Sequence, residues 1–358
     1  MILKDIIKKF DKSNIKAGDG LEKGNYPLYT CSPIVNKYLN DYLYEDEALI
    51  ISTGGNFSIH YVNGKFNYST DCYVFNTDKY NLKYLYYYLL SKKDDINKMF
   101  RGAGLKHLNK NEFVMLNIKD ISLNEQCDIV NQLDKVNEMI GLRKQEIEKC
   151  NNLIKSQFVE MFGDPNINNK NWKKRKLFDE CEIITGNTPS RKIESYYGNY
   201  IEWIKSDNIN EEKTYLTTAK EYLSEDGMNV GRYVDKNCIL MTCIAGSLKS
   251  IGNVSITNRK VSFNQQINGI VPKDNNVYFL YELFILSKDY LHTPVNMSLK
   301  GILSKNQLGN LEFIFPPIEL QNKFGKIFEQ IDKQKFEFEK SLKKLEELQA
   351  SLMQEYFG

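Results

Sequence analysis

The chain has 358 residues, of which 42% are hydrophobic and 26% charged, and its formal net charge at pH 7 is +2. This length accommodates two domains of ordinary size, and the absence of an apolar run near ~20 residues excludes a membrane-spanning helix. The N-terminus also lacks the apolar core of a signal peptide. The small net charge gives no global signal for nucleic acid, so any such partner has to be recognised by local patches.

Residues 1–121 form the first predicted domain. The apolar run Ala48–Ser52 predicts a buried strand that breaks at Gly54-Gly55. Ser58–Tyr61 and Cys72–Phe75 are further strand candidates, and Asn63-Gly64 predicts a hairpin turn between the first of these and Phe66. The helix expected over residues 81–92 carries several tyrosines. We assign them to a core rather than to a base-stacking platform: Tyr84, Tyr87 and Tyr88.

Residues 122–163 predict a long helix that starts with a capping box, in which Ser122 and Glu125 satisfy free amides of the first turn. Its apolar residues recur every three or four positions in the narrow seam of a coiled coil. The seam residues are Ile129, Leu133, Val136, Ile140, Arg143, Ile147, Cys150, Ile154, Gln157 and Met161. At ~1.5 Å per residue the helix is about 60 Å long, and it cannot bury this seam against itself.

Residues 164–316 form the second predicted domain, which parallels the first. A basic run over residues 170–176 leads into it and is either a solvated face or a phosphate clamp. Ile239–Thr242 repeats the buried strand, and residues 278–288 repeat the aromatic helix. The two domains match in the order of their elements but differ in their loops, which indicates one frame with two different binding surfaces.

Residues 317–358 repeat the first long helix at a constant offset of 195 positions, so that Gln126 falls on Gln321 and Leu153 on Leu348. The second seam is Phe324, Phe328, Ile331, Lys335, Phe338, Leu342, Leu345, Gln349, Leu352 and Tyr356. We therefore expect an α+β protein: two α/β domains in tandem, separated by two long helices that pair as an antiparallel intramolecular coiled coil. Two unrelated surface helices are the alternative, against which the gapless repeat argues.

Signals for catalysis are nearly absent from the sequence. The three histidines lie far apart, and neither a metal-ligand spacing nor a nucleotide-binding glycine loop is present. Phe315-Pro316-Pro317-Ile318 lacks the Asn or Asp and the aromatic residue of the adenine methyltransferase motif it superficially resembles. The seven cysteines fit reduced thiols in the cytoplasm. We expect a binding protein that holds no cofactor of its own.

Both domains place polar and basic side chains on glycine-bearing loops, where they are suited to read base edges and hold phosphates. The candidates in the first domain are Tyr29, Ser32, Ser52, Thr53, Asn56, Arg101 and Lys106. Those in the second domain are Asn187, Thr188, Ser190, Arg191, Lys205, Ser206, Asn208, Ser247, Lys249 and Lys300. Each residue taken alone also fits an ordinary surface position, so the prediction concerns the set.

Several stretches resemble the specificity subunits of type I restriction-modification systems. They are Asn171–Leu177, Ile184–Arg191, Tyr200–Ile204 and Pro316–Gln321, with Ile121–Gln126 as a weaker counterpart of the last. The resemblance covers essentially the whole chain, in the order of target-recognition domain, spacer helix, target-recognition domain and spacer helix. This tandem layout is more specific than any single motif.

The resemblance implies a non-catalytic subunit that reads a bipartite double-stranded DNA target. It also implies two methyltransferase partners that modify adenine N6 with S-adenosylmethionine, with an endonuclease or translocase subunit as an optional further partner. Half-sites about one DNA turn apart, ~34–36 Å, suit two domains held by such helices. Two other hypotheses remain open: a coiled-coil scaffold that binds proteins without reading DNA, and a self-contained methyltransferase or nuclease.

Overall fold

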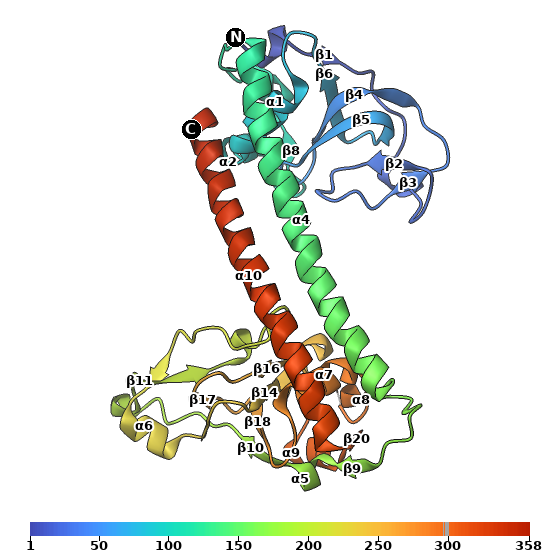
Figure 1. Cartoon of the computed structure of the whole chain (residues 1–358). Coiled ribbons are helices and arrows are strands. Elements are labelled where there is room, and N and C mark those ends of the chain that lie inside the picture. Colours follow the sequence, from blue (N-terminus) through green and yellow to red (C-terminus); the bar gives the residue numbers. More distant parts are fainter. Residues whose placement is uncertain (296, 298–300) are drawn as a thin grey trace. The chain divides into compact units, whose positions relative to one another are not determined.

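The computed structural model describes residues 1–295, 297 and 301–358, and these fall into two compact units. Unit 1 comprises Met1–Gln145 and Glu339–Gly358, and unit 2 comprises Glu146–Phe338. Each unit contains one mixed domain and parts of the two long helices (Figure 1). The units therefore divide the chain differently from the segments expected from the sequence, whose boundaries at residues 121, 163 and 316 stay a prediction.

The first domain is built on a six-stranded sheet with the strand order β1-β6-β4-β5-β2-β3. The strands are β1 (Lys8–Lys9), β2 (Tyr26–Tyr29), β3 (Tyr38–Leu39), β4 (Tyr44–Ser52), β5 (Ile59–Tyr68) and β6 (Cys72–Asn76). One sheet face packs against α1 (Leu82–Ser91), and its tyrosines Tyr84, Tyr87 and Tyr88 are buried, as predicted. The domain is completed by α2 (Lys93–Asn97), β7 (Phe100–Arg101), β8 (His107–Leu108) and α3 (Lys110–Phe113).

The hairpin turn predicted at Asn63-Gly64 is wrong, because β5 runs straight through these residues. Strand β4 offers a partner along the whole length, with Glu47 opposite Asn63 and Asp46 opposite Gly64. Gly64 adopts a φ of +127° inside the strand, a conformation that glycine reaches without steric cost. The Asn-Gly pair thus allows a local change of backbone conformation within the paired strands β4 and β5 and does not reverse the chain.

The second domain contains two four-stranded sheets, with the orders β10-β18-β14-β16 and β12-β11-β17-β13. The strands of the first are β10 (Cys181–Thr185), β14 (Ile239–Thr242), β16 (Val254–Ile256) and β18 (Ile267–Pro272). The strands of the second are β11 (Tyr197–Ile204), β12 (Tyr222–Leu223), β13 (Tyr233–Val234) and β17 (Val261–Phe263). The two-stranded pairs are β9 (Lys174–Lys176) with β20 (Glu312–Ile314) and β15 (Ile244–Ala245) with β19 (Gly301–Ile302). The helices are α5 (Leu177–Glu180), α6 (Glu225–Val230), α7 (Val277–Leu286), α8 (Lys288–His292) and α9 (Lys305–Asn310).

The two domains repeat one strand-pairing scheme. In the first domain β2 and β5 pair in parallel, with Leu28 opposite Asn67. In the second domain β11 and β17 also pair in parallel, with Trp203 opposite Ser262. Strand β11 is therefore the counterpart of β2. The antiparallel pair β4–β6 likewise has its counterpart in β14–β18.

The offset between equivalent residues shows where the second domain is longer. For β2 and its counterpart β11 the offset is 175, since Trp203 is equivalent to Leu28 (203 − 28). For β4 and its counterpart β14 it is 190, since Ile239 is equivalent to Leu49 (239 − 49). For the strands that follow it is 195, since Ser262 is equivalent to Asn67 (262 − 67). The second domain thus gains 15 residues between β11 and β14 (190 − 175) and five in the loop after β14 (195 − 190). The frame is repeated, and the additions lie in connecting segments.

The long helices are α4 (Leu123–Phe162) and α10 (Ile318–Phe357), each of 40 residues. In unit 1, Val136 and Ile140 in the first half of α4 pack against Leu345 in the second half of α10. In unit 2, Phe158 near the end of α4 packs against Phe324 near the start of α10, with ring centroids 5.4 Å apart. The helices are therefore antiparallel, as predicted, and the capping box at Ser122 and Glu125 is also present.

The predicted seam is confirmed in the middle of α4 and is wrong near its C-terminal end. Leu133, Val136, Ile140, Cys150 and Ile154 are buried as expected. Toward the end of the helix, Phe158 and Phe162 are fully buried in place of the predicted Gln157 and Met161. The helix end packs against α7 as well as α10, and this second partner rotates the buried face.

A buried glutamine ties the start of each long helix to the domain that precedes it. The Oε1 atom of Gln126 accepts a hydrogen bond from the Asn81 amide at 2.8 Å, at the start of α1. Its repeat Gln321 accepts from the Asn276 amide at 3.0 Å, at the start of α7. Both glutamines are 1% exposed, so each bond satisfies polar groups inside the protein.

The end of each long helix is anchored in the other domain. Phe357, the last helical residue of α10, packs on Tyr84 of the first domain with ring centroids 5.4 Å apart. Phe162, the last helical residue of α4, packs on Phe279 of the second domain at 5.0 Å. Each domain is thus held by the start of one long helix and the end of the other.

Candidate nucleic-acid interface

Two candidates in the first domain, Ser52 and Thr53, are buried where β4 ends. The Ser52 hydroxyl donates to the Asn56 carbonyl and accepts from the Ser58 amide, both at 2.8 Å. The Thr53 hydroxyl donates to the Asp71 carbonyl at 2.8 Å. These bonds close the turn after β4, so the two side chains shape the loop instead of facing solvent.

Three loops of the first domain meet at this end of β4. Gly54 forms a β-bridge with His107, and the Gly55 amide donates to the Lys106 carbonyl at 2.9 Å. The Ser58 hydroxyl donates to the carbonyl of Cys31, beside the candidate Ser32, at 3.5 Å. The structure therefore brings together loops that lie more than 70 residues apart in the sequence.

The remaining candidates of the first domain differ in exposure. Asn56 and Lys106 are exposed, and Ser32 is half-buried. Arg101 is exposed and forms an ion pair with Glu112 at 2.7 Å. Tyr29 is half-buried, and burial raises the pKa of its hydroxyl.

In the second domain, the loop of residues 187–191 is fixed to aromatic side chains of β11. The indole nitrogen of Trp203 donates to the Asn187 carbonyl at 3.3 Å, and the Tyr197 hydroxyl donates to the Pro189 carbonyl at 2.7 Å. The Asn187 side-chain amide donates to a backbone carbonyl of α6, and the Thr188 hydroxyl donates to the Gln265 side chain. Ser190 is exposed.

Arg191 and Lys205 form the densest charged cluster among the candidates, because both contact Glu221. Arg191 lies 2.6 Å from the Glu221 carboxylate, and Lys205 contacts its other oxygen. The guanidinium of Arg191 is 5.1 Å from the ring centroid of Trp203, and the Lys205 ammonium is also 5.1 Å from it. Hydrogen bonds from Lys205 and Arg191 hold the pKa of Glu221 below its ordinary value.

Asn208 is buried and structural: its side chain accepts from the Lys205 amide at 3.0 Å and donates to the Thr218 carbonyl at 3.1 Å. Ser206 is half-buried. Ser247 and Lys249 are exposed on the lengthened loop that follows β14. The candidate Lys300 lies outside the described residues.

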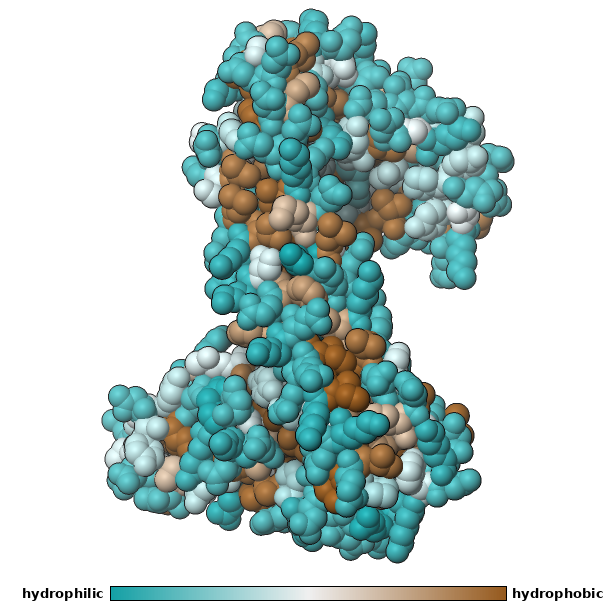
Figure 2. All heavy atoms as spheres, in the orientation of Figure 1, coloured by the Kyte–Doolittle hydropathy of each residue, from teal (hydrophilic) through white to brown (hydrophobic). Residues whose placement is uncertain are grey.

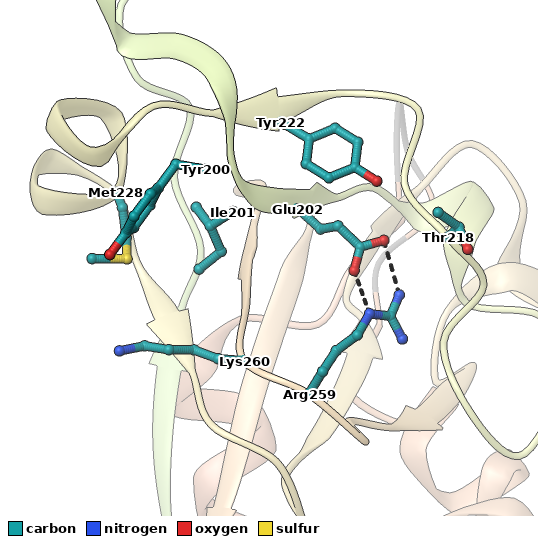
Figure 3. A pocket seen from close by; sticks show the side chains of 8 residues that line it. All are labelled: Tyr200, Ile201, Glu202, Thr218, Tyr222, Met228, Arg259 and Lys260. Carbon is teal, nitrogen blue, oxygen red and sulfur yellow. Dashed lines mark hydrogen bonds and ion pairs between the residues drawn. The ribbon is translucent and has the colours of Figure 1, made fainter.

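A cavity of about 470 Å³ beside β11 contains residues that the sequence analysis did not select. Figure 3 shows Tyr200, Met228 and Lys260 on one side and Glu202 with Arg259 on the other. Tyr200 is 58% exposed. The alternate spacing of Tyr200 and Glu202 in β11 places both side chains on one face and is the signal in the sequence for this face. Glu202 also lies opposite Tyr222 of β12.

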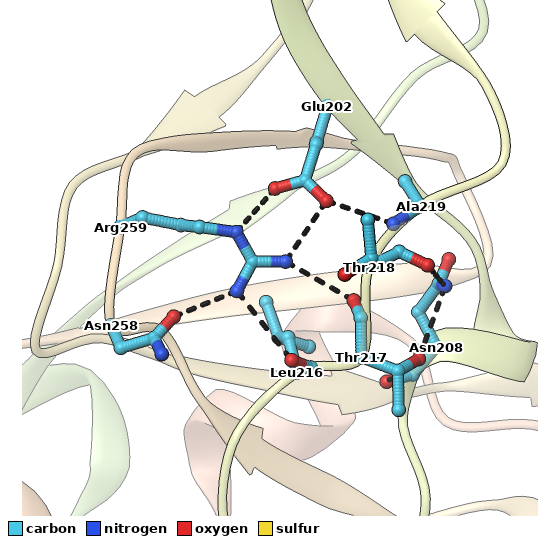
Figure 4. Close-up of polar contacts among 8 residues, drawn as sticks. All are labelled: Glu202, Asn208, Leu216, Thr217, Thr218, Ala219, Asn258 and Arg259. Atoms are coloured by element: carbon cyan, nitrogen blue, oxygen red, sulfur yellow. Dashed lines mark hydrogen bonds and ion pairs between the residues drawn. The ribbon is translucent and has the colours of Figure 1, made fainter.

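Arg259 is fully engaged inside the domain, as Figure 4 shows. It contacts both carboxylate oxygens of Glu202 and donates to Asn258 at 2.7 Å and to the Thr217 carbonyl at 3.1 Å. Glu202 in turn accepts from the Ala219 amide at 2.8 Å. This pair links β11 to the segment before β12. Lys260 also lines the cavity, and its ammonium lies 4.2 Å from the ring centroid of Tyr233.

Groups suited to catalysis are few in the part of the chain that the structure describes. No cluster of three or more His, Cys, Asp and Glu side chains there is placed to hold a metal. Burial raises the pKa of Cys181 to about 12 and that of Cys238 to about 11, so these thiols stay protonated near neutral pH. Among the described helices, none has the length and apolar character to cross a membrane.

A family model, the type I restriction modification DNA specificity domain, matches residues 1–152 and 169–350 of this chain. The two matched segments cover most of the sequence and follow its internal repeat. They also agree with the repeated strand pairing of the two domains.

Curated relatives carry the name of the same family, and solved structures share the fold. The MjaIX specificity subunit of Methanocaldococcus jannaschii is 29% identical over 50% of this chain and 43% of its own length. The HindI specificity subunit of Haemophilus influenzae is 33% identical over a segment that covers 31% of this chain and 24% of that relative. An S subunit structure from M. genitalium is 15% identical, covers 99% of this chain and 94% of its own, and has a TM-score of 0.70. A solved chain from a type I R-M system is 17% identical, covers 88% of this chain and 82% of its own length, and has a TM-score of 0.53.

Proposed function

Because this chain belongs to the family of type I restriction-modification DNA specificity proteins, we propose that it selects the DNA target of such a system. Each domain reads one half of a bipartite double-stranded sequence, and the chain itself is not catalytic. The observation that carries the proposal is one shared strand pairing with different loops. A repeated frame presents its loops alike, and different loops suit different half-sites.

The exposed candidates divide between two tasks in this proposal. Lys106, Arg191 and Lys249 hold backbone phosphates, because cationic side chains supply the sequence-independent part of binding. Asn56 in the first domain and Ser190 in the second also face solvent, and each reads base edges in its own half-site. The buried Ser52, Thr53 and Asn208 support these loops from below through their internal hydrogen bonds.

The long helices support docking of two methyltransferase subunits. Leu153 of α4 and its repeat Leu348 of α10 are 48% and 46% exposed, so an equivalent apolar position faces solvent on each helix. In Figure 2, hydrophobic side chains are visible along the stretch occupied by the long helices. These partners bring S-adenosylmethionine and methylate adenine N6, and an endonuclease or translocase subunit is a further partner. The assembly acts on DNA in the cytoplasm.

The test is methylation mapping of genomic DNA in cells that express the methyltransferase subunits with and without this chain. One bipartite motif should be modified only when the chain is present. Methylation that does not change when the chain is removed would contradict the proposal. A scaffold that binds only proteins would capture the partners without footprinting DNA, and the isolated chain should transfer no labelled methyl group.

A further inference from the structure

Arg191 and Lys205 reach the same carboxylate from different parts of the second domain. Arg191 is the last residue of the loop that is anchored on β11, Lys205 comes directly after β11, and Glu221 precedes the edge strand β12. Both cations also lie over the ring of Trp203, which is 3% exposed. The cluster therefore consists of two positive charges, one negative charge and a rigid aromatic base.

This cluster differs from the other arginine–glutamate pair of the same domain. The side chains of Arg259 and Glu202 are 32% and 11% exposed, and backbone groups hold both residues. The side chains of Arg191 and Glu221 are 55% and 35% exposed, and that of Lys205 is 34% exposed. An ion pair that solvent reaches is weakened by water and salt, and a phosphate oxygen offers these cations a hydrogen bond of the same kind. The Glu221 contact is thus suited to exchange, whereas the Glu202 contact is built into the fold.

The cations remain positioned when the carboxylate leaves. Trp203 is held by the hydrogen bond from its indole to the Asn187 carbonyl, and Arg191 also packs on Tyr197 with its guanidinium 4.4 Å from the ring centroid. Attraction between a cation and an aromatic face does not depend on Glu221. A phosphate that displaces Glu221 therefore meets two cations already in place.

We infer that Glu221 acts as an internal competitor of DNA phosphate and thereby sets the specificity of the second domain. In the free protein it occupies Arg191 and Lys205, which reduces their attraction for any duplex. On the correct sequence, base contacts from the neighbouring loops favour a close approach in which a phosphate replaces the carboxylate. This inference rests on the proposed function, and it assigns Glu221 a role in rejecting incorrect DNA.

The experiment uses the complex of this chain with its methyltransferase subunits and compares Glu221→Gln with Asp95→Asn. The control also removes one negative charge from a surface ion pair, Lys98–Asp95, but it frees no candidate cation. The probes are a duplex with the mapped target and a duplex of unrelated sequence. Titrations at several salt concentrations give the affinity and the number of phosphates contacted.

E221Q should bind the unrelated duplex about three- to tenfold more tightly than the wild type, with a smaller gain on the target, and its salt slope should steepen by about one to two. Adding Lys205→Ala should reverse most of the gain. Equal affinities of E221Q and D95N for the unrelated duplex would overturn the inference while leaving the proposed function intact. A wild-type complex without sequence preference would instead overturn the proposed function.

Glu221→Asp provides a second variant if E221Q does not fold. It keeps the charge but shortens the side chain, which weakens contact with two cations that approach from different elements. The same change in non-specific affinity is expected at a smaller size. A folded E221D complex with wild-type affinity for both duplexes would overturn the inference.

Discussion

The two domains share their strand pairing and their attachment to the long helices, and they differ in the segments that connect the strands. The buried glutamines Gln126 and Gln321, 195 residues apart, accept the same backbone hydrogen bond at the start of α1 and α7. The additional residues of the second domain lie between β11 and β14 and in the loop after β14. The comparison teaches that the residues which attach a domain to the long helices are separate from the connecting segments in which the two domains differ.

The largest effect is expected where the aromatic ends of the long helices enter the domains. Phe162→Ala should cost about 3–5 kcal/mol of unfolding free energy, because the ring is fully buried against Phe158, Phe279 and Phe324. Phe357→Ala should cost less, since its ring is 4% exposed. Urea denaturation followed by hydrogen exchange assigns each loss to a unit. An unchanged midpoint of urea denaturation for the Phe162 variant would show that this helix end does not anchor the second domain.

A pH effect should distinguish the second domain from the first. Burial raises the pKa of Glu282 to about 7, although the positive charges of Lys155 and Lys335 oppose the shift. The equivalent position of the first domain, 195 residues earlier, is occupied by Tyr87. The folded state therefore binds the proton more tightly than the unfolded state, whose ordinary pKa is 4.5. Stability from this group is complete below the unfolded value and is lost as pH rises through about 7. The loss amounts to about 3 kcal/mol.

The difference in unfolding free energy between wild type and Glu282→Gln isolates this group from other carboxylates. The difference should change between pH 5 and pH 8, with the wild type losing stability relative to the variant. A difference that stays constant over this range would show that Glu282 titrates near its ordinary value. The first domain should show no corresponding change in hydrogen exchange.

Equal and intermediate effects are expected from Gln126→Ala and Gln321→Ala. Each leaves a partly buried amide at the start of α1 or α7 without its partner, which costs about 1–3 kcal/mol. Thermal or urea unfolding of the two variants measures the losses. A gap of more than about 1 kcal/mol between them would mean that the repeated bonds are not equivalent in energy.

The smallest effect on stability is expected on the lengthened loop after β14. Lys249→Ala should change unfolding free energy by less than about 0.5 kcal/mol, because the side chain is exposed. In the assembled complex it should lower the salt slope of DNA binding by about one, if Lys249 holds a phosphate. An unaltered slope with unaltered stability would remove Lys249 from the proposed interface.

The sequence predicted those features that depend on local periodicity. The seam of α4 and its repeat in α10 follow from the three-to-four spacing, and the antiparallel pairing is confirmed by contacts such as Val136 with Leu345. The prediction failed where a second neighbour intervenes. Phe158 and Phe162 are buried because α7 adds a packing partner that the spacing of one helix does not contain.

The candidate site was harder to predict because its contacts are distant in sequence. Short polar residues at strand ends, such as Ser52 and Asn208, suit a ligand and a buried turn equally well, and only tertiary structure distinguishes the two. The Arg259–Glu202 contact joins residues 57 positions apart and has no local signal. The tandem layout was therefore accessible from the sequence, whereas the individual roles of loop residues required coordinates.

The reciprocal anchoring of Phe162 and Phe357 bears on the ancestry of the chain. A protein of half this length, with one domain and one helix, would contain both the aromatic pocket and the phenylalanine that fills it. In a twofold-symmetric dimer of such molecules, the phenylalanine at the helix end of each copy would fill the aromatic pocket of the other copy. Gene fusion would then need little more than the short polar stretch after Gly163, and each half would afterwards be free to acquire loops of its own.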